Sequence, residues 1–307
     1  MTNWRLGINT CFAVKRWPEP TEWARIVREE WGLDLVQHSL DLVDIEGPDD
    51  LLRSEAKEVR EACERYDLTL DSTFTGLAAY SSNILLDPRG QVRAHWERWL
   101  ERVMQFTVLA GGRLTGGHVG AFSVPVWLDD ARRAVAWREL GEELGRLAQH
   151  AKGLGLEGLY LENMAAAREP STMPQMEQLL SDGDAEHVPL VLCLDVGHEC
   201  VVGSEGPERD PYAWLQHFGA RLGCVHVQQS DANADHHWPF VEPFNQQGRI
   251  VAGRVLDVLE ASGADQVKLF LEVIPSFEQD DDLVLANLAE SVSYWRQAIA
   301  DRVTSIN

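Results

Sequence analysis

Cysteine, positive charge and long apolar runs are all scarce in this sequence of 307 residues. The five cysteines are widely spaced, odd in number and include no CxxC pair. Cys193 and Cys224 lie inside apolar runs of strand length, where a free cysteine behaves as a small apolar side chain. We therefore expect reduced, buried thiols and a reducing compartment rather than a disulfide framework.

Long apolar segments are also missing. No apolar run approaches the roughly 18 residues that a helix needs to cross a bilayer. The N-terminal segment MTNWRLGIN lacks the charged stretch followed by an apolar one that marks a secretory signal peptide. We expect no membrane-spanning segment and no signal peptide, and hence a cytoplasmic protein.

Positive charge is the third shortage, because 27 lysines and arginines stand against 49 aspartates and glutamates and leave a formal net charge of −22. Such a surface repels nucleic acid and anionic lipid, so we expect neither nucleic acid nor a membrane as a partner. A metal ion bound inside a cleft can still reverse the sign of the potential locally. The charge thus restricts the partners without identifying the reaction.

The sequence does contain a regular alternation of short apolar or β-branched runs with longer amphipathic stretches. Residues 49–66, 131–152 and 281–302 place apolar side chains at three- and four-residue spacing, as an amphipathic helix does. The strand candidates are Leu6–Asn9, Leu33–His38, Leu68–Phe74, Arg113–Val119, Leu156–Glu162, Val188–Asp195, Leu222–Val227 and Val267–Val273.

Eight strands that alternate with helices predict a parallel sheet, because a crossover helix must return the chain between parallel strands. The count of eight and the chain length favour a closed α/β barrel of the (β/α)8 or TIM type over an open sheet. No linker-like composition divides the chain, so we expect one domain over residues 1–307. Residues 229–249 form a long polar loop after the seventh strand, and we expect it to cover the site.

In such a barrel the chemistry lies where the strands end, and polar residues end the last four predicted strands. Glu162, Asp195 and Glu272 close the fifth, sixth and eighth runs, and His226 lies near the end of the seventh. Without a cation, three converging carboxylates would repel one another. We predict that these four residues hold one divalent metal ion, preferably Mn²⁺, with Mg²⁺, Co²⁺ or Zn²⁺ as alternatives.

Further candidates for substrate contacts lie near the same strand ends. His198 follows Asp195 by three residues, and His118 ends the fourth run between glycines. Asp235 and His237 form a D-x-H pair in the long loop, suited to a further metal or to a substrate oxygen. For each histidine, a hydrogen-bonded structural role is the alternative. The aromatic candidates for the pocket wall are Trp17, Trp238, Phe12 and Phe74.

Glu162, Asp195 with His198 three residues later, His226 and Glu272 on successive strands resemble the pattern of the xylose-isomerase-like TIM-barrel superfamily. The resemblance extends from the first strand to the eighth. The superfamily includes sugar isomerases, ketose 3-epimerases, inosose dehydratases and an apurinic-site endonuclease branch. It implies a divalent ion on the two glutamates, the aspartate and His226. In the epimerase branch, the glutamates also flank the substrate as acid and base, and the DxxH histidine contacts a substrate oxygen.

Two positions depart from the epimerase pattern. Ala232 lies six residues after His226, where those enzymes usually have an arginine. Arg168 lies six residues after Glu162, where they usually have an acid.

The hypothesis that follows is an isomerase or epimerase that moves a proton through a cis-enediolate on a small ketose or ketose phosphate. Glu162 and Glu272 would transfer the proton on opposite faces of the substrate, while His198 and His118 steady its oxygens. Return of the proton to the neighbouring carbon isomerises the sugar. Return to the opposite face of the same carbon epimerises it.

Three alternatives stay open at this point: a dehydratase of a cyclic polyol, an apurinic-site endonuclease-like phosphodiesterase, and a barrel that binds sugar without catalysis. The charge of −22 and the absence of histidine from the third strand, LTLDSTFT, disfavour the endonuclease. Lys15 and Arg16 follow the first strand and form either a phosphate contact or a solvated pair. By resemblance, a homo-oligomer, dimer or tetramer, is an open expectation.

Overall fold

Eight parallel strands follow one another in chain order around a closed barrel in the computed structural model, which describes residues 2–181, 187–200 and 206–304. The strands are β1 (Asn3–Asn9), β2 (Leu35–Ser39), β3 (Thr69–Phe74), β4 (Leu114–Gly117), β5 (Gly158–Glu162), β6 (Leu190–Asp195), β7 (Leu222–Val227) and β8 (Gln266–Leu271). The (β/α)8 barrel predicted from the sequence is thereby confirmed.

Helices separate the strands. The longer ones are α2 (Asp49–Arg65), α4 (Gly90–Ala110), α6 (Asp130–Leu154), α7 (Met173–Ser181), α8 (Pro211–Phe218), α10 (Ala252–Ala261) and α11 (Asp281–Thr304). The short ones are α1 (Pro20–Arg25), α3 (Leu77–Tyr80), α5 (Val124–Trp127) and α9 (Phe244–Gln247). The single turns of other helix types are η1 (Thr10–Ala13), η2 (Ile26–Glu30), η3 (Leu40–Leu42), η4 (Ile84–Leu86), η5 (His198–Cys200), η6 (Gly206–Arg209) and η7 (Gly219–Arg221).

The ends of α6 illustrate how the sequence fixes a helix. The side chain of Asp129 accepts hydrogen bonds from the backbone N–H groups of Ala131 and Arg132, which no earlier helical carbonyl could satisfy. At the other end Gly155 adopts the left-handed conformation with φ 87°, which costs a residue without Cβ little. The predicted helix over residues 131–152 is therefore extended by a few residues at its ends.

The fourth strand is shorter than predicted. It ends at Gly117, whereas the apolar pattern predicted a strand over Arg113–Val119. Gly116 and Gly117 have φ of 140° and 128°, values that side chains with a Cβ rarely adopt. A Cβ at Gly116 would lie 2.1 Å from the carbonyl oxygen of Tyr160 in β5. The backbones of β4 and β5 therefore approach more closely at this point than a residue with a Cβ would permit.

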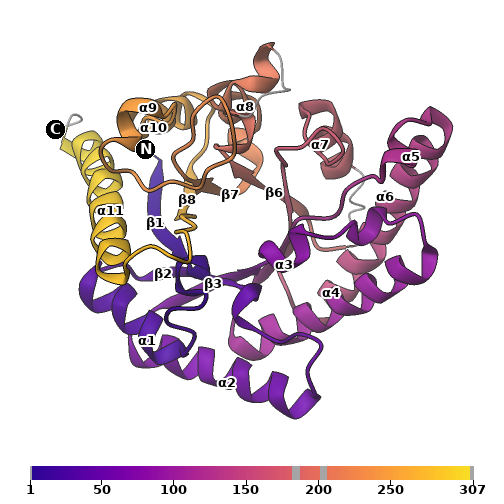
Figure 1. Ribbon diagram of the computed structural model, residues 1–307, viewed down its shortest axis with the longest axis horizontal. Helices are drawn as coiled ribbons and strands as arrows, with labels where there is room; N and C mark the ends of the chain where they lie inside the picture. The colour runs from indigo at the N-terminus through magenta and orange to yellow at the C-terminus, as the bar shows by residue number, and fades with distance from the viewer. Residues whose placement is uncertain (1, 182–186, 201–205, 305–307) are drawn as a thin grey trace. The chain divides into compact units, whose positions relative to one another are not determined.

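The chain forms two compact units. The first unit comprises Met1–Val36, Tyr66–Thr69 and Cys193–Asn307. In this unit β8 pairs with β1 on one side and with β7 on the other, and α11 packs beside β1 (Figure 1). Since Val227 of β7 is paired with Leu271 of β8, the carboxyl ends of these two strands lie side by side.

The second unit comprises Gln37–Arg65 and Leu70–Leu192. In this unit β4 pairs with β5 along its whole length, and α4 packs against both α2 and α6 (Figure 1). The buried side chains of α2 recur at three- and four-residue spacing, which is why this stretch forms an amphipathic helix. A single domain over residues 1–307 stays a prediction.

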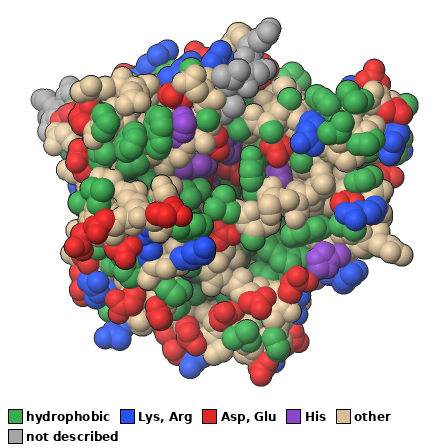
Figure 2. Space-filling view, viewed as in Figure 1, with side chains coloured by type: hydrophobic (Ala, Val, Ile, Leu, Met, Phe, Trp, Pro, Cys, Tyr) green, Lys and Arg blue, Asp and Glu red, His purple; other side chains and the backbone are tan. Residues whose placement is uncertain are grey.

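Acidic side chains are spread over the face shown in Figure 2, with fewer basic ones between them, as the net charge of −22 requires. Cys11, Cys63, Cys193 and Cys224 are buried and take part in no disulfide among the described residues, in line with the reduced thiols expected from the sequence. Within the described residues, no helix is long and apolar enough to cross a membrane.

Candidate metal centre and active site

The carboxyl ends of β6, β7 and β8 bring three of the predicted metal ligands together in the first unit. Asp195 is the last residue of β6, His226 lies one residue before the end of β7, and Glu272 directly follows β8. A carboxylate oxygen of each acid and a ring nitrogen of His226 lie within 4.8 Å of one another. All three side chains are buried. Two buried carboxylates and an imidazole are donors that Mn²⁺, Mg²⁺, Co²⁺ and Zn²⁺ all accept.

His226 and Glu272 form the closest contact of this group. Nδ1 of His226 lies 2.8 Å from Oε2 of Glu272. Burial raises the pKa of Glu272, but the attraction of His226 outweighs this effect and lowers the pKa to about 2. On the other oxygen, Oε1 accepts a hydrogen bond of 3.3 Å from Nδ2 of Asn9 at the end of β1. The Glu272 carboxylate is thus oriented from both sides.

Asp195 has the opposite electrostatic environment. Burial raises the pKa of its carboxyl group, and the nearby His198 and His237 only partly offset this. Oδ1 accepts hydrogen bonds from the backbone N–H of Gly197 at 2.6 Å and from Nε2 of Gln228 at 3.1 Å. A buried carboxylate held in this way has its charge best compensated by a bound cation.

Asp195 also belongs to a second group of donors. Its carboxylate lies within 4.8 Å of ring nitrogens of His198 and His237, which in turn lie within 4.8 Å of each other. Oδ2 of Asp235 lies 3.2 Å from Nε2 of His198 and 3.2 Å from Nε2 of His237. The DxxH motif after β6 and the D-x-H pair of the long loop therefore converge. Their binding of a further metal or of a substrate oxygen stays a prediction.

The charges of this second group are strongly coupled. Burial lowers the pKa of His237, but Asp235 outweighs it and raises the pKa to about 10. Burial likewise raises the pKa of Asp235, and the attraction of His237 and His198 overcomes it, holding this pKa well below its usual range. Asp235 and His237 therefore each favour the charged form of the other.

Gln228 connects the two donor groups. Its Nε2 donates to Asp195 and, at 2.7 Å, to Oδ1 of Asp235. Its Oε1 accepts from the hydroxyl of Ser230 at 2.7 Å and from the backbone N–H of His237 at 2.6 Å. The space that this amide occupies depends on Gly197, because a Cβ there would lie 2.3 Å from Cδ of Gln228.

The loop after β7 contains a group of stacked aromatic rings around Trp238. Trp238 is stacked between His236, with ring centroids 3.7 Å apart, and Phe244, at 4.9 Å. The backbone groups of Trp238 exchange two hydrogen bonds with Gln229, which closes the loop on itself. Its role as a wall of the substrate pocket stays a prediction.

The other predicted site residues of the first unit are Phe12 and Trp17. Phe12 is buried and packs against Trp31 at 4.9 Å and Trp17 at 6.1 Å between ring centroids. Nε of Arg16 lies 2.8 Å from Oδ1 of Asp281, and its Nη2 donates to two backbone carbonyls. Arg16 therefore ties the loop after β1 to the start of α11, and a phosphate would have to displace these contacts.

Glu162, His118 and Phe74 lie in the second unit. Glu162 ends β5, as predicted, and is buried. The buried His118 follows β4, and its backbone N–H donates to the hydroxyl of Thr75 at 2.8 Å. Phe74 ends β3 and packs against Tyr160 at 6.3 Å between ring centroids. Their roles in metal or substrate binding stay predictions.

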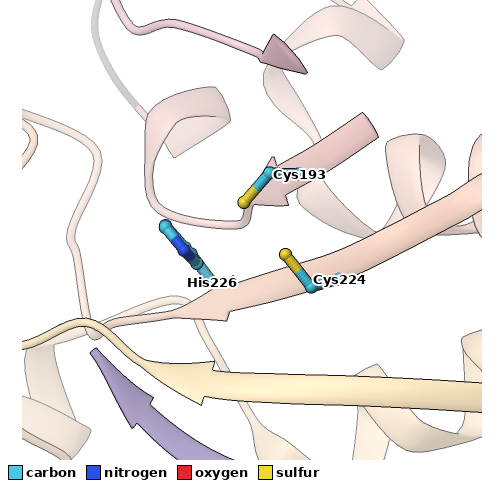
Figure 3. Close-up of side chains that lie close together, drawn as sticks. All are labelled: Cys193, Cys224 and His226. Atoms are coloured by element: carbon cyan, nitrogen blue, oxygen red, sulfur yellow. The ribbon is translucent and has the colours of Figure 1, made fainter. Parts of the chain in front are cut away.

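Two thiols lie beside His226 (Figure 3). Sγ of Cys193 on β6 and Sγ of Cys224 on β7 lie within 4.8 Å of each other and of a ring nitrogen of His226. All three residues are at most 1% exposed. The thiols occupy the positions two residues before Asp195 and His226, so they point to the same side of their strands as those ligands. They pack the layer beneath the donor groups.

Sequence reasoning missed Asn9 and Gln228. Asn9 is the polar residue that ends the first apolar run, so the same criterion that found Glu162 and Asp195 applies to it. Gln228 follows β7 directly, two residues after His226, where alternation places its side chain on the same side. Only the structure shows that its amide holds both Asp195 and Asp235.

The sequence matches the family model of the xylose isomerase-like TIM barrel over residues 27–297. The chain belongs to this family. A curated relative is the D-erythrulose 1-phosphate 3-epimerase of Brucella abortus (strain 2308), 26% identical over 297 residues that cover 94% of each chain.

Solved structures of the xylose isomerase-like family agree with this assignment. A proposed xylose isomerase from Rhodospirillum rubrum ATCC 11170 is 33% identical, covers 96% of this chain and 99% of its own, and superposes with a TM-score of 0.89. D-psicose 3-epimerase from Clostridium cellulolyticum H10 is 14% identical, covers 96% of this chain and 99% of its own, and has a TM-score of 0.70, a likeness of fold. The curated epimerase and the Rhodospirillum rubrum structure support the sugar isomerase or epimerase class predicted from the sequence.

Proposed function

We propose that the protein is a divalent-metal-dependent epimerase or isomerase of a small ketose or ketose phosphate. The observation that carries this proposal is the convergence of Asp195, His226 and Glu272 at neighbouring strand ends of a xylose isomerase-like barrel. The curated relative, which is named for 3-epimerisation of D-erythrulose 1-phosphate, favours epimerisation of a phosphorylated ketose.

The residues that would hold the ion are Glu162, Asp195, His226 and Glu272. Support comes from the donor set of the first unit and from the matching position of Glu162 as the last residue of β5. A bound divalent ion would polarise the ketose carbonyl and acidify the adjoining C–H bond. Mn²⁺ is our first candidate among the ions that this donor set accepts.

The two glutamates would move the proton. Glu272 takes the proton from the carbon next to the carbonyl, and the electron pair of the C–H bond moves into a cis-enediolate. Glu162, on the opposite face, gives a proton to the same carbon, and the carbonyl re-forms with inverted configuration at that carbon. Asn9 orients the Glu272 carboxylate through its hydrogen bond to Oε1. His198 and His118 would bind substrate oxygens.

A second ion is favoured by the group of Asp195, His198 and His237 with Asp235 beside it. Two imidazoles and two carboxylates are sufficient donors for Zn²⁺ or Mn²⁺. Asp195 would then be a ligand of both ions. The number of metal ions bound per chain therefore distinguishes a site with one ion from a site with two. If the wild type binds two ions per chain, His237→Asn should bind one. If the wild type binds one ion per chain, His237→Asn should still bind one. Elemental analysis of the dialysed proteins measures the number of ions per chain.

Proton exchange tests the proposed reaction. The Mn²⁺ protein is incubated in D₂O with a panel of ketoses and ketose phosphates, and deuterium is located by NMR. Incorporation at C3 with inversion identifies a 3-epimerase, whereas incorporation accompanied by an aldose product identifies an isomerase. Absence of exchange across the panel, with metal bound, would contradict the proposal and leave the polyol dehydratase and the endonuclease as rivals. Loss of water from a cyclic polyol and a gel shift with abasic DNA distinguish these two.

Three finer predictions accompany the proposal: Mn²⁺ as the native ion, a dimer or tetramer in solution, and a cytoplasmic location. Elemental analysis of protein purified without added metal tests the first. Light scattering coupled to size exclusion tests the second, and fractionation of the source cells tests the third.

A further inference from the structure

A pocket of about 450 Å³ in the first unit lies apart from the acidic donor groups. Its lining residues are Gly206, Arg209, Asp210, Tyr212, Arg249 and Arg254. Three arginines and only one acidic residue thus line the pocket, in a chain whose acids outnumber its bases by 49 to 27. This local excess of positive charge is the reverse of the overall balance.

The three arginines have few protein partners. Arg209 donates from Nη2 to the carbonyl oxygen of Ala232 at 2.9 Å. Its Nε is buried and has no hydrogen-bond partner among the described residues. The guanidinium of Arg254 lies over the ring of Tyr212, 3.6 Å from its centroid. In the described part of the chain, none of the three lies within ion-pair distance of a carboxylate. Buried donors without a partner are rare in proteins and call for a ligand.

The lining carboxylate is already engaged elsewhere. Oδ1 of Asp210 accepts a hydrogen bond of 3.1 Å from the backbone N–H of Tyr212 and thereby caps the start of α8. Its charge is directed toward the positive end of that helix, which leaves the guanidinium groups available to another anion.

The pocket is built on a fixed scaffold. The hydroxyl of Tyr212 donates to the carbonyl of Arg249 at 2.8 Å and accepts from the backbone N–H of Val251 at 3.0 Å. These bonds join the start of α8 to the segment that enters α10, and the two helices pack against each other (Figure 1). Hydrogen bonding to Tyr212 therefore holds the backbone of Arg249, and Arg254 lies within α10.

The loop after β7 links this pocket to the donor groups. Ala232, which accepts from Arg209, follows Ser230 by two residues. Ser230 accepts from the backbone N–H of Arg249 at 2.9 Å and donates its hydroxyl to Gln228, the residue that holds Asp195. One short segment thus contacts both the arginine pocket and the candidate metal centre.

We propose that the arginine pocket binds the dianionic phosphate of a phosphomonoester. Guanidinium groups bind phosphate oxygens through paired, charge-assisted hydrogen bonds, which a lone carboxylate or a neutral sugar hydroxyl does not match. The phosphate belongs either to the substrate or to a free phosphorylated effector. The first source deepens the proposed function, on which it rests, by making a ketose phosphate the substrate class.

Phosphate binding is measured first, because it requires no turnover. Isothermal titration of the protein with inorganic phosphate at constant ionic strength should give a dissociation constant in the millimolar range or below. Arg209→Gln combined with Arg254→Gln should weaken this binding by about tenfold or more, since each lost charge-assisted bond contributes to affinity. Arg53→Gln, which removes one exposed charge from α2, controls for the loss of a surface arginine and should leave the constant unchanged.

Three results would separate the outcomes. If phosphate does not bind, or binds the double variant and the Arg53→Gln control equally, the pocket is not a phosphate site. If phosphate inhibits competitively and Arg209→Gln raises KM only for the phosphorylated ketose, the substrate is the source. If phosphate binds in the same pocket but does not compete, an effector is the source. Glu272→Gln should retain phosphate binding, so the pocket can be tested even if the proposed reaction is wrong.

Discussion

Nε2 of Gln228 lies 2.7 Å from Oδ1 of Asp235 and donates a hydrogen bond to it. The same nitrogen lies 3.1 Å from Oδ1 of Asp195. A single neutral amide therefore holds together two carboxylates from different segments, one at the end of β6 and one in the loop after β7. This contact fixes the spacing of the donors before any ion binds.

Gln228→Glu should weaken metal binding and activity together. The new carboxylate would repel Asp195 and Asp235 and would remove the only hydrogen donor that the side chain of residue 228 offers to them. We expect the apparent metal affinity to fall by about 10–100-fold, the range for mutated outer-shell partners of metal ligands. Metal titration followed by calorimetry measures it. Gln246→Glu, on the exposed surface of α9, is the matched control. Equal affinities of the two variants would show that the amide does not position the donors.

Glu272→Gln should abolish proton transfer while the protein stays folded. Glutamine is of similar size but accepts no proton at neutral pH, so we expect kcat to fall by about 10²–10⁴-fold. Metal should bind more weakly, because a neutral amide oxygen replaces a carboxylate. Deuterium exchange under saturating metal measures the loss. Glu278→Gln, an exposed substitution six residues later, should retain activity. Full activity of Glu272→Gln with metal bound would exclude Glu272 as the base.

Removing the metal should destabilise the fold. The buried carboxylates of Asp195 and Glu272 repel each other without a cation, and an ion that binds only the folded state contributes about 2.7 kcal/mol at 100 times its Kd. We therefore expect chelation to lower Tm by several degrees and Mn²⁺ to restore it. Differential scanning calorimetry provides the measurement. Asp195→Asn should respond little to either treatment, and a response equal to that of the wild type would place the ion elsewhere.

Gly116→Ala should destabilise the protein, whereas Gly145→Ala should stabilise it. At position 116 the methyl group would meet the Tyr160 carbonyl in a backbone conformation with φ 140°, and we expect a loss of about 3 kcal/mol. At position 145, within α6, a Cβ meets no atom within 4 Å, and alanine should add about 0.5–1 kcal/mol. Urea unfolding of both variants tests the pair. A tolerated Gly116→Ala would mean that β4 and β5 can separate at little cost.

Acid should destabilise the protein partly through His38. This residue is 1% exposed, and burial lowers its pKa from 6.5 to about 4. Between these values the unfolded chain binds the proton and the folded one does not, so stability is fully present above about pH 6.5 and is lost as the pH falls toward 4. The shift corresponds to about 3 kcal/mol. His38→Gln should flatten the pH dependence of unfolding over this range. An unchanged slope would contradict the low pKa.

Several residues of the candidate site could be selected from the sequence because functional residues of a TIM barrel lie at the carboxyl ends of its strands. Asp195 and Glu162 each terminate a clear apolar run, and each is the last residue of its strand in the structure. The D-x-H pair of Asp235 and His237 was recognisable by spacing alone. The short extent of β4 was not, because the residue pattern over Arg113–Val119 does not reveal that the strand ends at Gly117.

The polar support of the site could not be predicted from the sequence. The side-chain amide of Gln228 offers two donor hydrogens and two acceptor positions. The amino-acid sequence does not specify which nearby polar groups form hydrogen bonds with them. The three arginines of the pocket are spread over 45 positions, from Arg209 to Arg254, so no local pattern contains the pocket. Such features depend on how segments distant in the chain are packed.

Gly197 and Gln228 form a pair whose identities depend on each other. Any side chain at 197 would overlap the amide of Gln228, which a Cβ would approach to 2.3 Å. Replacement of Gly197 therefore requires a shorter side chain at position 228, without the hydrogen bonds to Asp195 and Asp235, or a shift of the backbone around one of the two positions. In evolution or in a combinatorial library, positions 197 and 228 should consequently vary together. Which substitutions are tolerated at one position should depend on the residue at the other.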